Sequence, residues 1–323
     1  MVKCFIIIFL FLASLSSAIV LHPDGEPSPL WSNRPSDAVL AKVGACSGVV
    51  IHPNYVLSAD HCGFTSVTPV IINGVTYYST YFRSHYYRGD LVLIKIDAEL
   101  ENFIPIPEYD ILDVEEDKDP NDQDFNVVVG GYGAIRGEAV YATYDLNVVV
   151  GYRWTTPYGT LTWGTNEIYG HNMARAYMLF DELFSTPYES ALAVYDSGCG
   201  CFMYRDGLWW TIGIGKSVTD YGYDYFKHPS DPGRDYGTQN TINRVYSMSG
   251  WINSVIYGSD MNRDGYIDED DLVLFLEDWL VVDNPEHPNI FNYYHRYNSR
   301  SDLNQDGRVN LRDFAIFAKD WKN

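Results

Sequence analysis

The sequence predicts a mainly β region, built as an antiparallel barrel or sandwich, followed by a short duplicated tail with helices. Short apolar runs broken by Gly, Pro, Asn and Asp fill residues 40–246, a pattern typical of all-β folds. The runs are Gly48–Ile51, Leu91–Ile96, Asn126–Val129, Leu146–Val150 and Leu208–Ile214. The 27 tyrosines also indicate sheets, and we favour sheet packing over a carbohydrate-binding platform as their role. A helix is expected over Ile242–Ile256, where the β region ends.

The chain begins with the layout of a secretory signal peptide. A positive start precedes an almost wholly apolar run over 4–12, and the stretch 13–18 ends in small residues. We expect cleavage after Ala18 and secretion. A retained membrane anchor is the alternative, but the apolar run is short for a bilayer, and no later stretch is long or apolar enough to span one.

The composition excludes several classes of protein. The hydrophobic fraction of 46% over 323 residues rules out general disorder and fits about two domains. The formal net charge is -21, from 43 Asp and Glu against 22 Lys and Arg. A surface this acidic lacks the basic footprint of a nucleic-acid-binding protein, so nucleic acid is not an expected partner.

Cysteine chemistry depends on the secretory prediction. Loss of Cys4 with the signal leaves four cysteines, Cys46, Cys62, Cys199 and Cys201, which allow three pairings in an oxidising compartment. Cys199 and Cys201 lie two apart on an expected strand, so their side chains share a face. A strained disulfide between Cys199 and Cys201 and a pair of free thiols are the two alternatives, and a zinc site is a weaker one.

The tail carries a repeat with an offset of 42 residues, in which residues 260–279 align with residues 302–321. Each copy holds oxygen-bearing side chains at positions 1, 3, 5, 9 and 12 of a loop, with Gly at position 6 to allow a sharp turn. This donor pattern suits Ca²⁺, and two ions are expected; a pair of acidic turns is the alternative. The expected ligands, with the main-chain carbonyl at position 7, are Asp260, Asn262, Asp264, Tyr266, Asp268 and Asp271 in the first loop, and Asp302, Asn304, Asp306, Arg308, Asn310 and Asp313 in the second.

One helix is expected after each loop, over Asp271–Leu280 and Asp313–Trp321, and no amphipathic helix is expected before either loop. This loop-helix duplicate, residues 258–323, resembles a dockerin, the calcium-dependent module by which secreted enzymes attach to cohesin domains. The resemblance implies a small all-α module and a cohesin-like scaffold partner. Loop positions 10 and 11, which often carry small hydroxyl residues in dockerins, are Glu269-Asp270 and Leu311-Arg312 here.

Three short segments of the β region contain the residue types that peptide-bond hydrolysis requires. His61 follows Leu57-Ser58-Ala59-Asp60, Asp90 heads an apolar strand, and Ser197 lies in Asp196-Ser197-Gly198. A hydroxyl nucleophile needs an imidazole to take its proton and a carboxylate to orient the imidazole. Their order along the chain, His, Asp, Ser, is that of chymotrypsin-like enzymes. Each motif alone is common in turns or caps; the joint pattern favours the enzyme.

Residues 19–257 therefore resemble a serine protease of the chymotrypsin/trypsin family, which implies a double antiparallel β-barrel. The histidine, aspartate and serine segments match the family boxes, Gly131-Tyr132-Gly133 resembles its mid-chain turn, and Tyr246–Ile256 its closing helix. The resemblance implies a disulfide between Cys46 and Cys62, and an oxyanion hole formed by the N–H groups of Tyr195 and Ser197.

The departures from the family concern activity. Tyr195 and Cys199 stand where Gly is usual, and Asp60 replaces a small residue and is expected to raise the pKa of His61.

The resemblance also implies how the enzyme becomes active and what it cleaves. Cleavage after Ala18 exposes Ile19-Val20, and the family pattern pairs the new Ile19 ammonium with Asp196. A coincidental Ile-Val flank is the equal alternative. Ala191 lies at the base of the expected specificity pocket, where no carboxylate favours Arg or Lys, so a preference for apolar side chains is expected.

The sequence thus predicts a secreted serine endopeptidase acting on a protein or peptide, with no cofactor for catalysis, tethered to a scaffold by its calcium module. The alternative is a catalytically inactive protease fold that serves as a binding module on the same dockerin.

Overall fold

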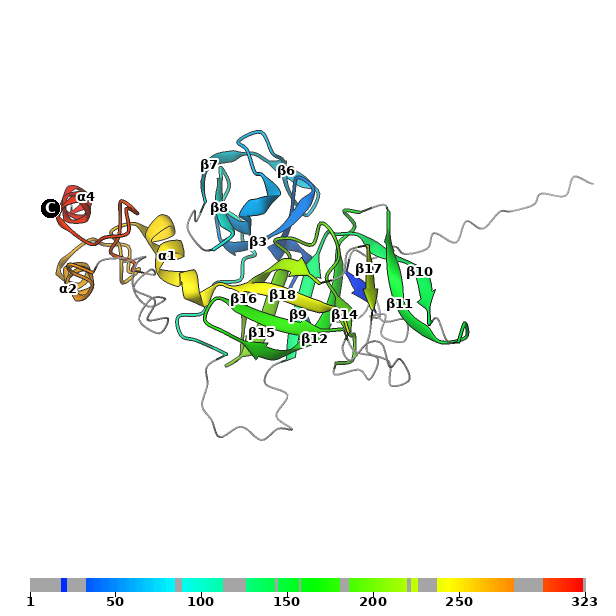
Figure 1. Cartoon of the computed structure of the whole chain (residues 1–323). Helices are drawn as coiled ribbons and strands as arrows, with labels where there is room; N and C mark the ends of the chain where they lie inside the picture. The colour runs from blue at the N-terminus through cyan, green and yellow to red at the C-terminus, as the bar shows by residue number, and fades with distance from the viewer. Residues whose placement is uncertain are drawn as a thin grey trace, which may run out of the picture.

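The computed structural model describes residues 19–21, 33–84, 89–112, 126–142, 145–156, 158–180, 186–219, 222–225, 237–281 and 299–321. Within these residues the chain is mainly β, with two barrel-like sheets followed by a short helical region (Figure 1). This confirms the mainly β prediction and the helical end of the chain. The expected signal peptide, residues 1–18, lies outside the described residues. Across the described ranges, no helix combines the length and the apolar character needed to cross a membrane.

The first barrel-like sheet contains seven antiparallel strands in the order β6-β5-β2-β3-β4-β8-β7. Its central strands are rich in Val, Ile and Leu and are buried along nearly their whole length. The strands are β2 (Leu40–Val43), β3 (Cys46–His52), β4 (Tyr55–Ala59), β5 (Val70–Ile72), β6 (Val75–Tyr77), β7 (Ser79–Ser84) and β8 (Leu91–Ile96).

The second sheet is a closed barrel in the order β12-β13-β18-β16-β15-β9. Closure leaves this sheet without a free edge. Its strands are β9 (Asn126–Gly131), β12 (Thr162–His171), β13 (Arg175–Leu179), β15 (Gly200–Arg205), β16 (Leu208–Val218) and β18 (Gln239–Arg244).

Two small sheets flank the barrel. One has the order β10-β11-β17, from Ile135–Tyr141, Val149–Thr155 and Tyr223–Tyr225. The other pairs β1 (Val20–Leu21) with β14 (Ser190–Ala191). The predicted run Leu146–Val150 therefore belongs to a strand that begins only at Val149, because Asp145 and Asn147 form a turn before it.

The largest hydrophobic core lies between the two barrel-like sheets. Leu57 of β4, Trp163 of β12 and Phe202 of β15 meet there, and Trp251 of the closing helix packs against the same cluster. Phe202 is completely buried. Full burial of a side chain of this size contributes about 2 to 3 kcal/mol, so this core holds the two sheets together and fixes their relative placement.

The predicted helix over Ile242–Ile256 is wrong in its first part. Ile242 lies in β18, where it pairs with Ala176 of β13 on one side and Gly215 of β16 on the other. Ladder pairing on both sides overrides the local apolar pattern. A 3-10 turn (η5, Tyr246–Met248) follows, and helix α1 runs over Ser249–Tyr257.

The tail contains helices α2 (Glu269–Glu277) and α4 (Leu311–Asp320), which pack through Phe275 and Phe317, both completely buried. Both helices begin two residues earlier than predicted because position 9 of each loop, Asp268 or Asn310, caps the helix. Helix α1, which was predicted as part of the Ile242–Ile256 helix, ends at Tyr257, shortly before the first loop begins at Asp260. Residues 282–298, which precede the second loop, lie outside the described residues.

A polar contact links the tail to the rest of the chain. The Gln305 side-chain carbonyl accepts a hydrogen bond from Arg83 Nε of β7 at 2.6 Å and another from Trp251 Nε1 of α1 at 3.3 Å. The second loop therefore touches both the first sheet and the closing helix.

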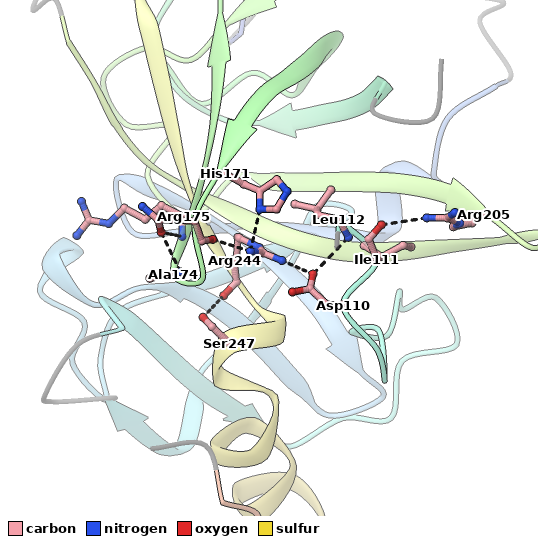
Figure 2. A network of polar contacts seen from close by, with 10 residues as sticks. Asp110, Ile111, Leu112, His171, Ala174, Arg175, Arg205, Arg244 and Ser247 are labelled. Atoms are coloured by element: carbon pink, nitrogen blue, oxygen red, sulfur yellow. Dashed lines mark hydrogen bonds and ion pairs between the residues drawn. The ribbon is translucent and has the colours of Figure 1, made fainter. Parts of the chain in front are cut away.

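Two arginines, Arg244 and Arg205, hold the segment around Asp110 and Ile111, which belongs to the connection from β8 to β9 that we call the crossover (Figure 2). Arg244, at the end of β18 and almost fully buried, forms an ion pair with Asp110 of the crossover and donates a hydrogen bond to the His171 ring at 3.2 Å. Arg205 of β15 donates to the Ile111 carbonyl at 2.9 Å, so the same stretch is held at a second point. These contacts fix the end of β18, which borders the site described next.

Candidate active site

Strand pairing brings His61 and Asp90 together. His61 lies in a 3-10 turn (η3, Asp60–Cys62) directly after β4, and Asp90 directly precedes β8. Because β4 and β8 are antiparallel, with Ala59 opposite Leu91, the end of one strand lies beside the start of the other. The predicted disulfide between Cys46 and Cys62 is present and ties the histidine turn to β3.

Ser197 reaches the same point from the second barrel. It lies in a turn before β15, and its carbonyl accepts a hydrogen bond from the Ser47 N–H of β3 at 2.9 Å. Gly198, with φ of +82°, packs so closely on Ser47 that a Cβ atom would lie 2.2 Å from the Ser47 carbonyl oxygen. Only glycine fits there, so Gly198 is needed for the two sheets to meet at this turn.

The three side chains form a continuous hydrogen-bonded chain. His61 Nδ1 is 2.9 Å from each carboxylate oxygen of Asp90, and the His61 backbone N–H also donates to this carboxylate at 3.0 Å. His61 Nε2 is 2.7 Å from Ser197 Oγ. With the ring proton on Nδ1 facing Asp90, Nε2 is free to accept the serine proton. The structure therefore brings together all three residues of the predicted triad.

The electrostatics of the pair suit a proton shuttle. The hydrogen bond to Asp90 raises the pKa of His61, partly offset by burial of the ring, and the nearby charge of Lys216 also lowers it. Burial acts to raise the pKa of Asp90, but the side-chain and backbone hydrogen bonds from His61 outweigh it and hold this pKa below its usual value. Asp90 is therefore ionised whenever His61 titrates.

Asp60 has a smaller influence on the histidine than Asp90. Its negative charge raises the pKa of His61, as predicted, but is the least of the contributing causes. One Asp60 oxygen accepts a hydrogen bond from Ser84 Oγ at 2.5 Å, which turns the carboxylate toward β7.

Tyr195 adopts the backbone conformation that glycine usually supplies. Its φ is +72°, in the left-handed region, which costs a residue with a Cβ atom about 1 to 2 kcal/mol. Its ring lies against the ring of Tyr158, with centroids 4.4 Å apart. The side chain at this position is thus tolerated rather than excluded.

Asp196 is a buried carboxyl held by backbone groups. One oxygen accepts from the Gly133 N–H at 2.8 Å and the other from the Ala193 N–H at 2.9 Å. A Cβ atom on Gly133 would lie only 2.4 Å from this carboxyl, which explains the glycine in the Gly131-Tyr132-Gly133 turn. Asp196 is 1% exposed, and burial raises its pKa to about 8.

The predicted Ile19–Asp196 pair is placed only in part. Val20 pairs with Ala191 in the β1–β14 ladder, and Ile19 is completely buried in a cluster that includes Leu192. Among the described residues no ion pair joins Ile19 to Asp196. The Ile19 nitrogen belongs here to the peptide bond with Ala18, so it carries no charge.

Ala191, the predicted base of the specificity pocket, is buried beside Val20 and Phe180. Cys199 and Cys201 are both buried free thiols, which decides between the two options that the sequence left open. Burial raises the pKa of each thiol, so neither is ionised at neutral pH.

Two residues at this site were missed by sequence reasoning. Lys216 lies in β16 where the ladder to β18 shifts register between Gly215 and Ser217, and its charge acts on both His61 and Asp90. Asn243 of β18 donates to the Asp90 carbonyl at 3.5 Å. A bulge often redirects a side chain next to a site, but a bulge depends on strand pairing and leaves no clear signal in the sequence.

Both tail loops curl around a buried carboxylate at position 12. In the first loop, Asp271 is completely buried and accepts hydrogen bonds from the N–H groups of Met261 at 2.6 Å and Asp268 at 3.0 Å. The Gly265 N–H donates to Asp260 at 3.1 Å. These backbone donors curl the loop around the carboxylates of Asp271 and Asp260.

The second loop repeats this arrangement. Asp313 is completely buried and accepts from the N–H groups of Asn304 at 3.0 Å and Asn310 at 2.9 Å. The Gly307 N–H donates to Asp302 at 2.9 Å. Positions 9 and 12 of each loop also form a capping box, which accounts for part of the sequence pattern without a metal.

Two observations bear on whether the loops fit a cation. Asp260 Oδ1 is buried and has no hydrogen-bond partner. Burial, together with the charges of Asp313 and Asp306, raises the pKa of Asp302 to about 6. A hard cation would satisfy the first group and offset the repulsion at the second.

In the described part of the chain, no three or more His, Cys, Asp and Glu side chains are arranged to hold a metal ion. The described residues therefore give no support to the zinc alternative at Cys199 and Cys201. The expected calcium ligands also include asparagines and main-chain carbonyls, and the buried Asp260 Oδ1 has no hydrogen-bond partner.

A scan of the chain against protein-family models finds no match, and a search of curated proteins finds no relative.

Proposed function

We propose that residues 19–257 form a serine endopeptidase of chymotrypsin-like double-barrel architecture. The observation that carries the proposal is the unbroken contact from Asp90 through His61 to Ser197, at 2.9 and 2.7 Å, across the junction of the two barrel-like sheets. The sheets themselves are consistent with a double barrel.

In the proposed mechanism, Ser197 Oγ attacks the carbonyl carbon of the scissile peptide while His61 Nε2 takes the hydroxyl proton. The imidazolium is stabilised by the ionised Asp90. His61 then returns the proton to the departing amine, and the acyl group remains on Ser197. A water molecule, deprotonated by His61, releases the acid product. The N–H groups of Tyr195 and Ser197 would hold the oxyanion, each contributing on the order of 3 kcal/mol to the transition state.

Fluorophosphonate labelling tests this proposal, because an activated serine oxygen displaces fluoride from the reagent and becomes phosphonylated. Wild-type protein should be labelled, and Ser197→Ala should not. Ser217→Ala, which removes a serine of β16 and leaves Ser197 in place, is the matched control and should be labelled like the wild type. A folded wild-type protein that takes no label would instead favour the inactive, protease-fold binding module.

Activation is proposed to occur when signal peptidase cuts after Ala18. The β1–β14 pairing brings the segment 19–21 beside residues 190–191, and the buried Asp196 carboxyl is held by neutral backbone donors alone in the hydrogen bonds described. A new Ile19 ammonium reaching Asp196 would supply the missing cation. N-terminal sequencing of the secreted protein should begin at Ile19; a start several residues away would contradict the proposal.

The primary specificity is proposed to be for apolar side chains. Ala191 and its neighbours Val20 and Phe180 offer no carboxylate to a basic residue. A peptide library should therefore show cleavage after apolar residues, whereas efficient cleavage only after Arg or Lys would refute this part.

The tail is proposed to bind two Ca²⁺ ions and to dock the enzyme on a cohesin-like scaffold at a cell surface or in a multi-enzyme assembly. Besides the loops, the two helices expose large apolar side chains that a partner could cover. These are Val273 and Leu276 on α2, and Leu311 and Phe314 on α4.

Calorimetric titration with Ca²⁺ tests the ion stoichiometry. The full chain should bind two ions, and the variants Asp260→Ala and Asp302→Ala should each bind one. Arg263→Ala, at loop position 4, is the matched control and should still bind two. Absence of any calcium binding to folded protein would refute the module.

A further inference from the structure

We propose that Tyr158 is a positioning residue for the oxyanion site: its ring holds Tyr195 in the left-handed conformation that aims the Tyr195 N–H at the reacting carbonyl. The proposal rests on the proposed peptidase function and extends it to a residue that never touches the triad.

The need for such a residue follows from the backbone of Tyr195. A φ of +72° is adopted without strain by glycine but not by a residue with a Cβ atom. Relaxation to a negative φ would rotate the peptide plane between Val194 and Tyr195. Because that plane carries the Tyr195 N–H, the rotation would turn the donor out of the oxyanion site.

The contact that opposes this rotation is the aromatic pair. The Tyr158 and Tyr195 rings are in close contact, with centroids 4.4 Å apart and an interplanar angle of 39°, at the short end of the distances of about 4.5 to 7 Å that favour aromatic pairs. The contact forms with the Tyr195 backbone at its left-handed angle, so the pair stabilises that conformation.

Tyr158 is itself connected to the Asp196 turn. The N–H of the next residue, Gly159, donates to the Gly133 carbonyl at 3.4 Å, and the Gly133 N–H donates to the Asp196 carboxyl at 2.8 Å. Asp196 directly follows Tyr195. The ring of Tyr158 and the amide of Gly133 therefore hold the same turn from two sides.

Tyr158 is 44% exposed, so a direct contact with substrate is the competing role. The two roles differ kinetically. A residue that aims the oxyanion donor changes kcat, whereas a residue that only contacts substrate changes KM.

The experiment combines Tyr158→Ala with Tyr195→Gly. Tyr158→Ala should lower kcat about three- to tenfold with little change in KM, while Tyr158→Phe, which keeps the ring, should match the wild type. In the Tyr195→Gly background, Tyr158→Ala should have no effect on kcat, because glycine keeps the left-handed angle unaided. An equal loss in both backgrounds, or a change confined to KM, would overturn the proposal.

Failure of the enzyme proposal can be distinguished from failure of this one. If wild-type protein neither hydrolyses peptides nor takes the fluorophosphonate label, the proposed function is wrong. The pair is then tested by urea unfolding of the wild type, Tyr158→Ala, Tyr195→Gly and the variant that carries both substitutions. Coupling between the two sites of about threefold or more in the unfolding equilibrium constant supports the aromatic contact, and additive effects overturn it.

Discussion

The buried carboxyl of Asp196 should make the stability of the uncut chain depend strongly on pH. The perturbation is Asp196→Asn in a chain that retains the residues before Ile19. Asn fills nearly the same volume but does not titrate. Because Asp196 is 1% exposed, its environment is set by the protein and not by solvent.

The magnitude follows from the pKa. Asp196 has a pKa of about 8 in the folded chain, against 3.8 as its ordinary value. Between these pH values the folded chain keeps a proton that the unfolded chain has lost. The free energy of unfolding is therefore highest below pH 4 and falls until pH 8, by about 6 kcal/mol in total.

The assay is urea unfolding followed by tryptophan fluorescence at a series of pH values from 4 to 8.5. The uncut wild type should lose stability with rising pH, and Asp196→Asn should remove most of that loss. In the Asn variant the side-chain NH2 group faces one of the two backbone N–H donors, so one hydrogen bond is lost. This lowers the free energy of unfolding by about 1 to 3 kcal/mol at every pH. The pH slope, not the absolute stability, is thus the quantity to compare.

The mature chain supplies the critical contrast. When Ile19 carries a free ammonium against Asp196, the carboxylate is stabilised and the loss between pH 4 and 8 should shrink. Equal slopes in the uncut and mature chains would refute the proposed pairing. A flat profile for the uncut wild type would refute the account of Asp196 as an uncompensated buried carboxyl.

Three further predictions concern the triad and its surroundings. Asp90→Asn should lower kcat by about 10⁴-fold, because the Asn amide donates a hydrogen bond to His61 and favours the tautomer whose Nε2 carries the proton. Steady-state kinetics on variants shown to be folded checks this. An activity within tenfold of the wild type would contradict it. Lys216→Met removes a charge that lowers the pKa of His61, so the acidic limb of the kcat/KM profile should move to higher pH, whereas Lys216→Arg should leave it in place. Replacing both Cys46 and Cys62 by Ala opens a bridge with a sequence separation of 16 and should destabilise the chain by about 3 kcal/mol; unchanged urea midpoints would show that the bridge is dispensable.

The triad could be predicted from sequence because each member lies in a short segment with its own local signal. His61 and Cys62 follow a strand, Asp90 starts one, and Ser197 lies in a turn where Gly198 is sterically required. The pairing of β4 with β8 then brings His61 and Asp90 together, and the backbone contact of Ser197 with Ser47 adds the serine from the second barrel.

What the sequence did not predict depends on contacts across the fold. Ile242 belongs to a strand because ladders on both sides of β18 recruit it, and Lys216 reaches the triad through a register shift. The starts of α2 and α4 were placed two residues late because Asp268 and Asn310 were assigned as calcium ligands alone, although they also cap the helices.

In the proposed enzyme, Ser197 acts as the nucleophile and carries the acyl group during turnover. The decisive measurement is mass spectrometry of protein that is acid-quenched during turnover of an activated ester and then digested. The acyl group should be found on the peptide that contains Ser197 and should be absent in His61→Ala, where the proton acceptor is lost. An acyl group on another residue, or none on a protein that hydrolyses peptides, would contradict the proposed mechanism.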